Sequence, residues 1–213
     1  MIIAVDGPAA SGKGTIARRL AAHYDLAHLD TGTLYRRVGM GMVIRGDDIH
    51  NPDEAASAAA DIDQLVVSEA QLRSEDAGKA ASVVAAMGDV GAILKAYQQN
   101  FAKNPPGGKA GAVIDGRDIG TVICPDADAK LFVTASLDVR TDRRFAEIQA
   151  RGGDVLRNDI RADLAARDER DANRAVSPLK QAEDAHLLDT TKLDIEAAVA
   201  KAIALVDACL GQP

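Results

Sequence analysis

Residues 2–15 read Ile-Ile-Ala-Val-Asp-Gly-Pro-Ala-Ala-Ser-Gly-Lys-Gly-Thr, and this stretch decides the fold. A short apolar run leads into a glycine-rich turn, which is followed by Lys13 and a helix-forming stretch. Gly7 and Gly12 permit backbone torsions and close approaches that a Cβ would block. Such a turn aims successive backbone N–H groups at one point, where phosphate oxygens can bind. The pattern predicts strand, phosphate loop and helix in that order, with an ordinary glycine turn as the alternative.

The lysine and the hydroxyl that follow the turn refine this interpretation. Lys13 can reach the β- and γ-phosphates of a nucleotide, and a nearby hydroxyl can hold Mg²⁺. The strict pattern has that hydroxyl directly after the lysine, whereas here Gly14 intervenes and the hydroxyl belongs to Thr15. The order Gly-Lys-Gly-Thr resembles small nucleotide kinases more than GTPases or motor ATPases.

Composition narrows the class of protein. The 213 residues are enough for one sizeable core with inserted lobes, and 47% of them are apolar. The net charge of −7 argues against a nucleic-acid binder, which would show a basic face. Local arginines can still attract a small anionic substrate. We expect Cys124 and Cys209 to be plain thiols, although the sequence leaves a disulfide between them open.

Targeting signals and metal motifs are not evident in the sequence. No charged leader precedes an apolar segment, and no apolar run reaches the length of a membrane span. The four histidines lack metal-ligand spacing, and we assign them no chemistry. We expect a cytoplasmic protein that acts on small molecules, with neither nucleic acid nor a membrane as a partner. Nothing in the sequence demands more than a monomer.

Five short apolar runs have the character of buried parallel strands. They are Ile2–Val5, Ala27–Leu29, Ala112–Ile114, Leu131–Thr134 and His186–Leu188. Helical patterns separate them, among them residues 13–24 and a last helix with Asp194 as its N-cap. The alternation predicts an α/β fold with a doubly wound, five-stranded parallel sheet flanked by helices. In such sheets, ligands bind at the carboxyl ends of the strands.

Two stretches interrupt this alternation. Residues 37–104 carry helical patterns without a strong strand and end at an Asn-Pro-Pro-Gly-Gly run. Residues 147–174 are highly charged. We expect both to be inserted lobes, the first binding substrate and the second acting as a mobile lid. The core phosphate-loop domain then comprises residues 1–36, 105–146 and 175–213.

Arginines dominate the segment around the expected lid. Nine arginines and no lysine lie between positions 140 and 174, interleaved with acids. One interpretation is a solvated helix with ion pairs at i,i+4, such as Asp163 with Arg167. The other is phosphate binding, because the planar guanidinium grips phosphate oxygens in pairs. Several such groups stabilise the charge of a phosphoryl group during transfer.

Polar residues also follow the second and third expected strands. Thr31 can cap a helix, and Arg36, one turn further on, can grip a second phosphate. Asp115 can organise Mg²⁺ through water. Arg117 and Asp118 fit a ligand-binding edge or a surface turn equally well.

Together, several stretches resemble the bacterial cytidylate kinases over nearly the whole chain. They are Gly-Pro-Ala-Ala-Ser-Gly-Lys-Gly-Thr (7–15), Asp-Thr-Gly-Thr-Leu-Tyr-Arg (30–36), Asp-Gly-Arg-Asp-Ile-Gly-Thr-Val (115–122), Arg-Asp-Glu-Arg-Asp-Ala-Asn-Arg-Ala-Val-Ser-Pro-Leu (167–179) and Asp-Thr-Thr (189–191). The resemblance implies transfer of the γ-phosphoryl group of ATP to CMP or dCMP, with Mg²⁺.

The resemblance also implies roles for individual residues. ATP would contact Gly7, Pro8, Ala9, Ala10, Ser11, Gly12, Lys13, Gly14 and Thr15. The CMP phosphate would contact Thr31, Arg36, Arg117 and Arg174; the sugar Arg167 and Asp171; and cytosine Ser82 and Asp118. The lid arginines that close over the transferring phosphoryl group would be Arg140, Arg143 and Arg144, which join Lys13 and Arg174 as the catalytic set. Thr15 and Asp115 would serve Mg²⁺, directly or through water.

This chain departs from the family pattern at two places. The segment 66–72 is short, so we expect a reduced, mostly helical substrate lobe. Many members carry an arginine that donates to the cytosine ring where this chain has Gly91. Lys95, one helical turn later, is either a partial substitute or an exposed helix lysine.

Two other functions stay open from the sequence. One is a different small phosphate-loop kinase, acting on UMP or another monophosphate, or on a small alcohol such as shikimate. Arg36, Arg117 and Arg174 suit a phosphate acceptor better than an alcohol. The other is a nucleotide-binding module without catalysis, which would not need an arginine-rich lid.

Overall fold

The computed structural model describes residues 1–174 and 177–211. Ala175 and Val176 of the 167–179 motif lie outside the described residues, as do Gln212 and Pro213 of the expected core segment. The chain divides into two compact units. The first unit comprises Met1–Leu29 and Asn104–Pro213, and the second comprises Asp30–Lys103.

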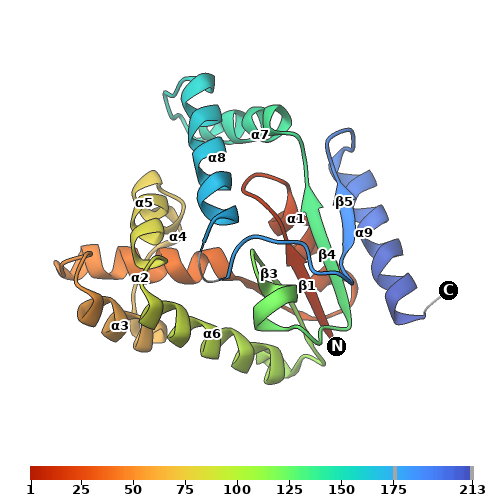
Figure 1. The fold of residues 1–213 in the computed structure, drawn as a ribbon, viewed down its shortest axis with the longest axis horizontal. Helices are drawn as coiled ribbons and strands as arrows, with labels where there is room; N and C mark the ends of the chain where they lie inside the picture. Colours follow the sequence, from red (N-terminus) through yellow and green to blue (C-terminus); the bar gives the residue numbers. More distant parts are fainter. Residues whose placement is uncertain (175–176, 212–213) are drawn as a thin grey trace. The chain divides into compact units, whose positions relative to one another are not determined.

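A five-stranded parallel sheet organises the first unit and confirms the predicted α/β fold. The strands are β1 (Ile2–Asp6), β2 (Ala27–Asp30), β3 (Ala112–Gly116), β4 (Ala129–Thr134) and β5 (His186–Asp189). Their order is β2-β3-β1-β4-β5, so β1 is central. Figure 1 shows β1 between β3 and β4. Each strand is one or two residues longer than predicted. The chain leaves β1 toward β2 and leaves β4 toward β5, and a ligand crevice is expected where neighbouring connections diverge in this way.

Four long helices belong to the first unit. They are α1 (Lys13–His23), α7 (Leu137–Ala150), α8 (Arg157–Ala172) and α9 (Ile195–Leu210). Helices α1 and α9 bury Ile16, Leu20 and Val206 in the same core as the strands. Each such side chain contributes about 1.5–3 kcal/mol when fully buried. Asp194 caps α9 as predicted, because its Oδ1 accepts from the Ala197 N–H at 2.8 Å.

The expected first helix, residues 13–24, includes one residue more than α1, which is Tyr24. It lies just beyond the end of α1 instead of on the helix, and its hydroxyl donates to Asp207 at 2.6 Å. The buried position on that turn of α1 belongs to Ala21. The helix ends early because the backbone of Asp25 adopts a positive φ of 53°.

The described residues of the second unit beyond Asp30 form helices and connections, without a strand, as predicted for 37–104. The helices are α2 (Thr31–Arg45), α3 (Pro52–Ala60), α4 (Glu69–Leu72), α5 (Glu75–Val84) and α6 (Gly88–Lys103). Small residues let α2 and α5 approach closely: a Cβ on Gly39 would lie 2.8 Å from Ala80. The alanine-rich sequence thus permits tight helix packing with few large side chains.

The expected domain boundaries and the expected cap of α2 differ from the observed elements. The expected domain boundaries at 36/37 and 146/147 fall inside α2 and α7. Thr31 does not cap a helix, contrary to one interpretation: it is the first residue of α2 and is buried. The cap is Asp30, whose carboxylate accepts from the Thr33 N–H at 3.3 Å. An aspartate in extended backbone directly before a helix fills this role well.

Two further properties bear on the environment of the protein. Cys124 is buried and Cys209 half-buried, and both are free thiols. Within residues 1–174 and 177–211, no single helix has the length and apolar character needed to cross a bilayer; only the bent pair of α5 and α6 meets that test jointly.

Asp6, the last residue of β1, anchors the segment that follows β3. Its two carboxylate oxygens accept from the N–H groups of Ile119 and Gly120, each at 2.8 Å. These residues begin a short π-helical turn, Ile119–Ile123. Burial raises the pKa of Asp6 to about 6, although the two N–H donors act in the opposite direction. The carboxylate therefore fixes the turn that carries Arg117 and Asp118 at its start.

We predict that Asp6→Asn lowers the free energy of unfolding by about 1–3 kcal/mol at pH 7.5, because one amide oxygen replaces two acceptors. The folded pKa lies above the unfolded value, so between pH 7 and pH 4 the folded wild type binds a proton before the unfolded chain does. Acidification over that window therefore favours the folded wild type, and the difference in unfolding free energy between the two proteins should widen. Urea unfolding of both proteins at several pH values measures it. A gap that narrows on acidification would contradict this account of Asp6.

Candidate phosphate-binding site

The loop between β1 and α1 has the backbone geometry that the sequence predicted. Gly7 adopts a φ of +152°, and a Cβ there would lie 2.0 Å from the carbonyl oxygen of Val133 in β4. Ala10 and Gly12 also have positive φ values, of 59° and 91°. The loop therefore needs glycine at its first position for lack of space. At Gly12 the need is for a left-handed torsion.

The start of α1 is open to a ligand. Gly12 is its N-cap, and no side chain in the described part of the chain caps it. The first N–H groups of a helix have no partner within the helix and carry partial positive charge. Lys13 is the first residue of α1, followed by Gly14 and Thr15. This arrangement suits a phosphate group.

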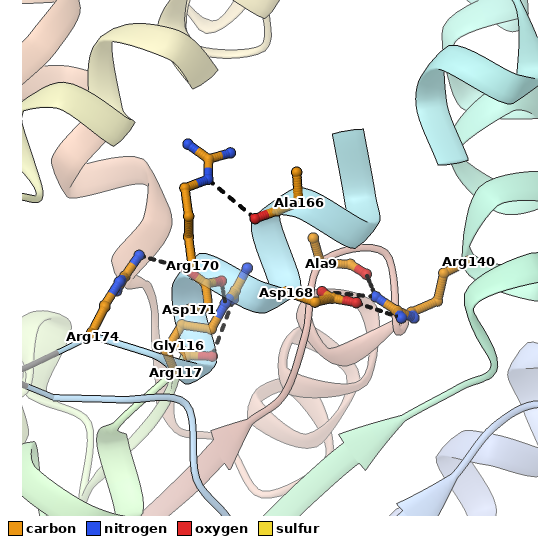
Figure 2. Close-up of polar contacts among 9 residues, drawn as sticks. All are labelled: Ala9, Gly116, Arg117, Arg140, Ala166, Asp168, Arg170, Asp171 and Arg174. Carbon is orange, nitrogen blue, oxygen red and sulfur yellow. Dashed lines mark hydrogen bonds and ion pairs between the residues drawn. The ribbon is translucent and has the colours of Figure 1, made fainter. Parts of the chain in front are cut away.

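Two arginines of α7 bind carbonyl groups of this loop. Arg140 donates to the Ala9 oxygen at 3.3 Å and forms two hydrogen bonds with Asp168 of α8, at 3.0 and 2.7 Å (Figure 2). Arg143 donates to the Ser11 oxygen at 3.3 Å, and burial lowers its pKa. Both guanidinium groups thus contact the loop backbone, on alternate carbonyls.

Arg144 has a different environment from its two neighbours in α7. It pairs with Glu147, one turn later, at 2.9 Å. Other arginines of the segment make exposed pairs between α7 and α8, such as Arg157 with Asp142 and Arg161 with Asp138. Exposed pairs of this kind contribute little to stability. These two pairs are exposed, as the ion-pair interpretation expects, but they join two helices and are not the i,i+4 pairs of a single helix.

Asp171 of α8 brings together two arginines that are distant in sequence. Its carboxylate accepts from Arg117 Nε at 2.8 Å and from Arg174 Nη2 at 2.5 Å (Figure 2). Burial raises the pKa of Asp171, but the neighbouring Arg117, Arg174 and Arg167 outweigh burial, and the net pKa is lowered. Asp171 therefore stays ionised and holds a concentrated positive charge beside the end of β3.

Asp118 follows Arg117 and leads into the π-helical turn. Its carbonyl oxygen accepts from the N–H groups of Val122 and Ile123, at 2.8 and 3.1 Å. These bonds fix its backbone at the carboxyl end of β3, where ligands of such sheets bind.

Asp115 lies near the start of α1. A Cβ on Gly14 would be 3.8 Å from Asp115 Oδ1, and the other oxygen is 2.9 Å from His28 Nε2. Mg²⁺ prefers oxygen ligands and commonly uses one or two protein groups together with water and substrate phosphates. The carboxylate of Asp115 and the hydroxyl of Thr15 fit that donor set. No group of three or more His, Cys, Asp or Glu side chains among the described residues could hold a metal by itself.

The second unit positions the remaining predicted residues. Arg36 donates through Nη1 to the Leu72 carbonyl at 2.8 Å, which fixes its guanidinium over α4. The Ser82 hydroxyl donates to the Gly78 carbonyl of its own helix at 3.0 Å. Gly91 lies in α6 with open space where its Cβ would be.

Sequence reasoning missed four residues that support the site: Asp6, His28, Asp168 and Thr190. Asp6 is the last residue of β1 and Thr190 directly follows β5, and this position at the end of a strand was the available signal. The sequence carries no such signal for Asp168 and His28, because their partners, Arg140 and Asp115, lie far away in the chain.

Comparison with known proteins places this geometry in a family. The family described as cytidylate kinase matches residues 3–208. A cytidylate kinase of Xanthobacter autotrophicus is 56% identical over 210 residues, covering 98% of both chains. One of Rhodopseudomonas palustris (strain BisA53) is 54% identical over 208 residues, covering 98% of this chain and 97% of the relative.

Solved structures agree on the fold. An uncharacterized protein from Eubacterium ventriosum has a TM-score of 0.58 at 16% identity, covering 98% of this chain and 99% of the other. The protein TT1252 from Thermus thermophilus has a TM-score of 0.53 at 18% identity, with 98% and 96% covered. At these identities the likeness concerns the fold alone. The full-length sequence matches decide the family: this chain belongs to the cytidylate kinases, and it is a phosphotransferase.

Proposed function

We propose that this chain transfers the γ-phosphoryl group of ATP to CMP or dCMP, giving ADP and CDP or dCDP. The observation that carries the proposal is the pairing of two sites in the first unit. One is the open start of α1 with Lys13, and the other is the pair Arg117 and Arg174 gathered on Asp171. Phosphoryl transfer between two anions needs a donor phosphate site and a separate cationic acceptor site.

ATP binds with its triphosphate in the loop of residues 7–15. The backbone N–H groups and Lys13 neutralise the β- and γ-phosphates. A cavity of about 260 Å³ lies beside this loop. It is lined by Ser11, Gly12, Thr15, Ile16, Arg143, Thr190, Leu193, Asp194, Ile195 and Ala198. Its lining combines apolar side chains with polar groups, which suits the adenosine end of the nucleotide.

Thr15 and Asp115 would hold Mg²⁺, directly or through water, next to the β- and γ-phosphates. The ion supplies positive charge that offsets the charge of the triphosphate. His28 Nε2 donates to the Asp115 carboxylate at 2.9 Å and thereby orients it.

The acceptor phosphate is held by arginines. Arg117 and Arg174 supply paired N–H donors, while Asp171 keeps their planes fixed. On the resemblance to the family, we propose that Thr31 and Arg36 also bind the CMP phosphate, and that Ser82 and Asp118 bind cytosine. The carboxylate of Asp118 can accept from the exocyclic amino group of cytosine, where uracil carries a carbonyl oxygen that it would repel.

The chemistry needs no strong general base. The nucleophile is a phosphate oxygen of CMP that is already anionic, so positioning and charge stabilisation dominate the rate. Arg144 is the α7 arginine that is best placed to turn toward the transferring group, since its ion pair with Glu147 lies within one helix. Closure of the lid, which we propose to be residues 147–174, would exclude water from the reaction.

We predict that a panel of acceptors in a coupled ADP assay gives rapid turnover with CMP and dCMP, and little with AMP or shikimate. Arg117→Ala should raise the KM for CMP by about 10- to 100-fold, because a charge-assisted bond to the acceptor phosphate is lost. Arg161→Ala is the matched control, since Arg161 makes an exposed pair with Asp138. It should leave kcat and the KM for CMP unchanged. Faster turnover of shikimate than of CMP would reject this function in favour of an alcohol kinase.

We propose that groups in the second unit, besides Asp118 of the first, also affect the choice between CMP and UMP. The resemblance to the family implies an arginine that donates to the ring at the position of Gly91, so we propose that this chain discriminates against UMP less strongly. The space around Gly91 can accept a long side chain, because no heavy atom lies within 4 Å of an added Cβ. Lys95 remains the candidate for a partial substitute.

We predict that Gly91→Arg raises the ratio of kcat/KM for CMP over UMP by about tenfold, because a new donor to the ring nitrogen favours cytosine. Gly91→Ala controls for the gain in helix propensity and should leave the ratio unchanged. Lys95→Ala tests the substitute: a lower ratio supports it, and an unchanged ratio removes it. Should Gly91→Arg fold normally without changing the ratio, the selectivity proposal fails.

Two proposals about the environment of the protein complete the function. We propose a monomer in the cytoplasm, with small-molecule substrates and neither a nucleic acid nor a membrane as a partner. The acidic composition supports the absence of a nucleic-acid partner.

A further inference from the structure

The hydroxyl of Thr190 lies at the junction of three segments. Thr190 directly follows β5 and is 1% exposed. Its Oγ1 lies 3.0 Å from the carbonyl oxygens of both Ser11 and Thr134, and it accepts from Arg143 Nη1 at 2.9 Å. One buried hydroxyl therefore joins the phosphate loop, the end of β4 and helix α7.

The proton of this hydroxyl is needed most at the loop. A hydroxyl has one proton to donate. The Thr134 oxygen already accepts from the Thr190 backbone N–H at 2.8 Å. The Ser11 oxygen has a weaker second donor, Arg143 at 3.3 Å, and Ser11 is completely buried. Because a buried carbonyl without a donor is costly, the Ser11 oxygen depends chiefly on Thr190.

Holding the Ser11 oxygen also aims the next N–H group. The carbonyl of Ser11 and the N–H of Gly12 belong to one planar trans peptide, in which they point in opposite directions. A carbonyl drawn toward Thr190 turns the Gly12 N–H away from Thr190. The start of α1, which begins at that point, then presents its N–H groups as an anion site.

Arg143 takes part as a partner of Thr190. Its Nη1 donates to Thr190 Oγ1 and the Ser11 oxygen, and its Nη2 donates to the carbonyls of Thr190 and Leu193, at 2.8 and 3.5 Å. Each terminal nitrogen of a guanidinium carries two protons, so all four are engaged. In this conformation Arg143 acts on the loop backbone.

We infer that Thr190 is a positioning residue for ATP: its hydroxyl fixes the Ser11–Gly12 peptide in the orientation that binds the triphosphate. The inference rests on the proposed ATP site and assigns Thr190 no contact with the reacting atoms. It explains why an inward hydroxyl follows β5, at a point where valine would fill the same volume.

Calorimetric titration of ATP with Mg²⁺ tests this inference on the whole protein, without an acceptor. Thr190→Val keeps the shape and removes the hydroxyl. We expect it to raise the Kd for ATP by about tenfold or more, since the buried Ser11 carbonyl loses its main donor. The KM for CMP should change less than twofold. Thr190→Ser retains the hydroxyl and should restore ATP binding to near the wild-type value.

Thr121→Val is the matched control. The Thr121 hydroxyl is also buried, and no partner for it is found among the described residues, so its loss should leave ATP binding unchanged. Thr190→Ala is a second test in case valine is not accommodated, and circular dichroism establishes folding of each variant.

The outcomes separate this inference from the proposed function. A wild type that does not bind ATP would refute the proposed function itself. A folded Thr190→Val or Thr190→Ala that binds ATP as tightly as the wild type would overturn the role of Thr190 alone. An equal rise in the Kd for ATP and the KM for CMP, or failure of both variants to fold, would assign the hydroxyl to general stability. Either result would also overturn the inference about Thr190.

Discussion

The close approach of two backbones at the end of the central strand is the constraint on which the structure depends. At Gly7, the chain passes so near the Val133 carbonyl of β4 that an added Cβ would lie 2.0 Å from that oxygen. Because β1 is held on both sides by β3 and β4, the chain must turn at once. That turn becomes the loop before α1. A rigid parallel sheet thus fixes a flexible glycine-rich segment at the carboxyl ends of the strands, where ligands bind in this class of fold.

The acids of α8 give the arginine-rich region its order. Asp168 pairs with Arg140 of α7, and Asp171, one turn later, pairs with Arg117 after β3 and with Arg174. Asp171 is buried, so removal of Arg117 would leave its charge less well compensated. These pairs tie the helix to the loop and the sheet edge while keeping guanidinium groups concentrated at the site. An anionic substrate can then share donors that are already oriented.

Much of the fold follows from local patterns, whereas the site depends on contacts that the sequence does not display. The strands were predictable because buried parallel strands are short apolar runs, and the loop because Gly7 and Gly12 meet backbone requirements. One interpretation of Thr31 placed the cap of α2 one residue late, since Asp30 and Thr31 are both residue types that cap helices well. The pairing of Asp168 with Arg140 was not predictable, because both lie among many equivalent acids and arginines.

The most direct test of the central claim is calorimetric titration of ATP into the wild type and Lys13→Ala, each with Mg²⁺. If the turn after β1 binds the triphosphate, the wild type binds ATP at one site. Loss of the lysine charge should then weaken that binding by about 10- to 100-fold while thermal stability without nucleotide is retained. Equal ATP affinity in the two proteins, both folded, would contradict the account at its foundation.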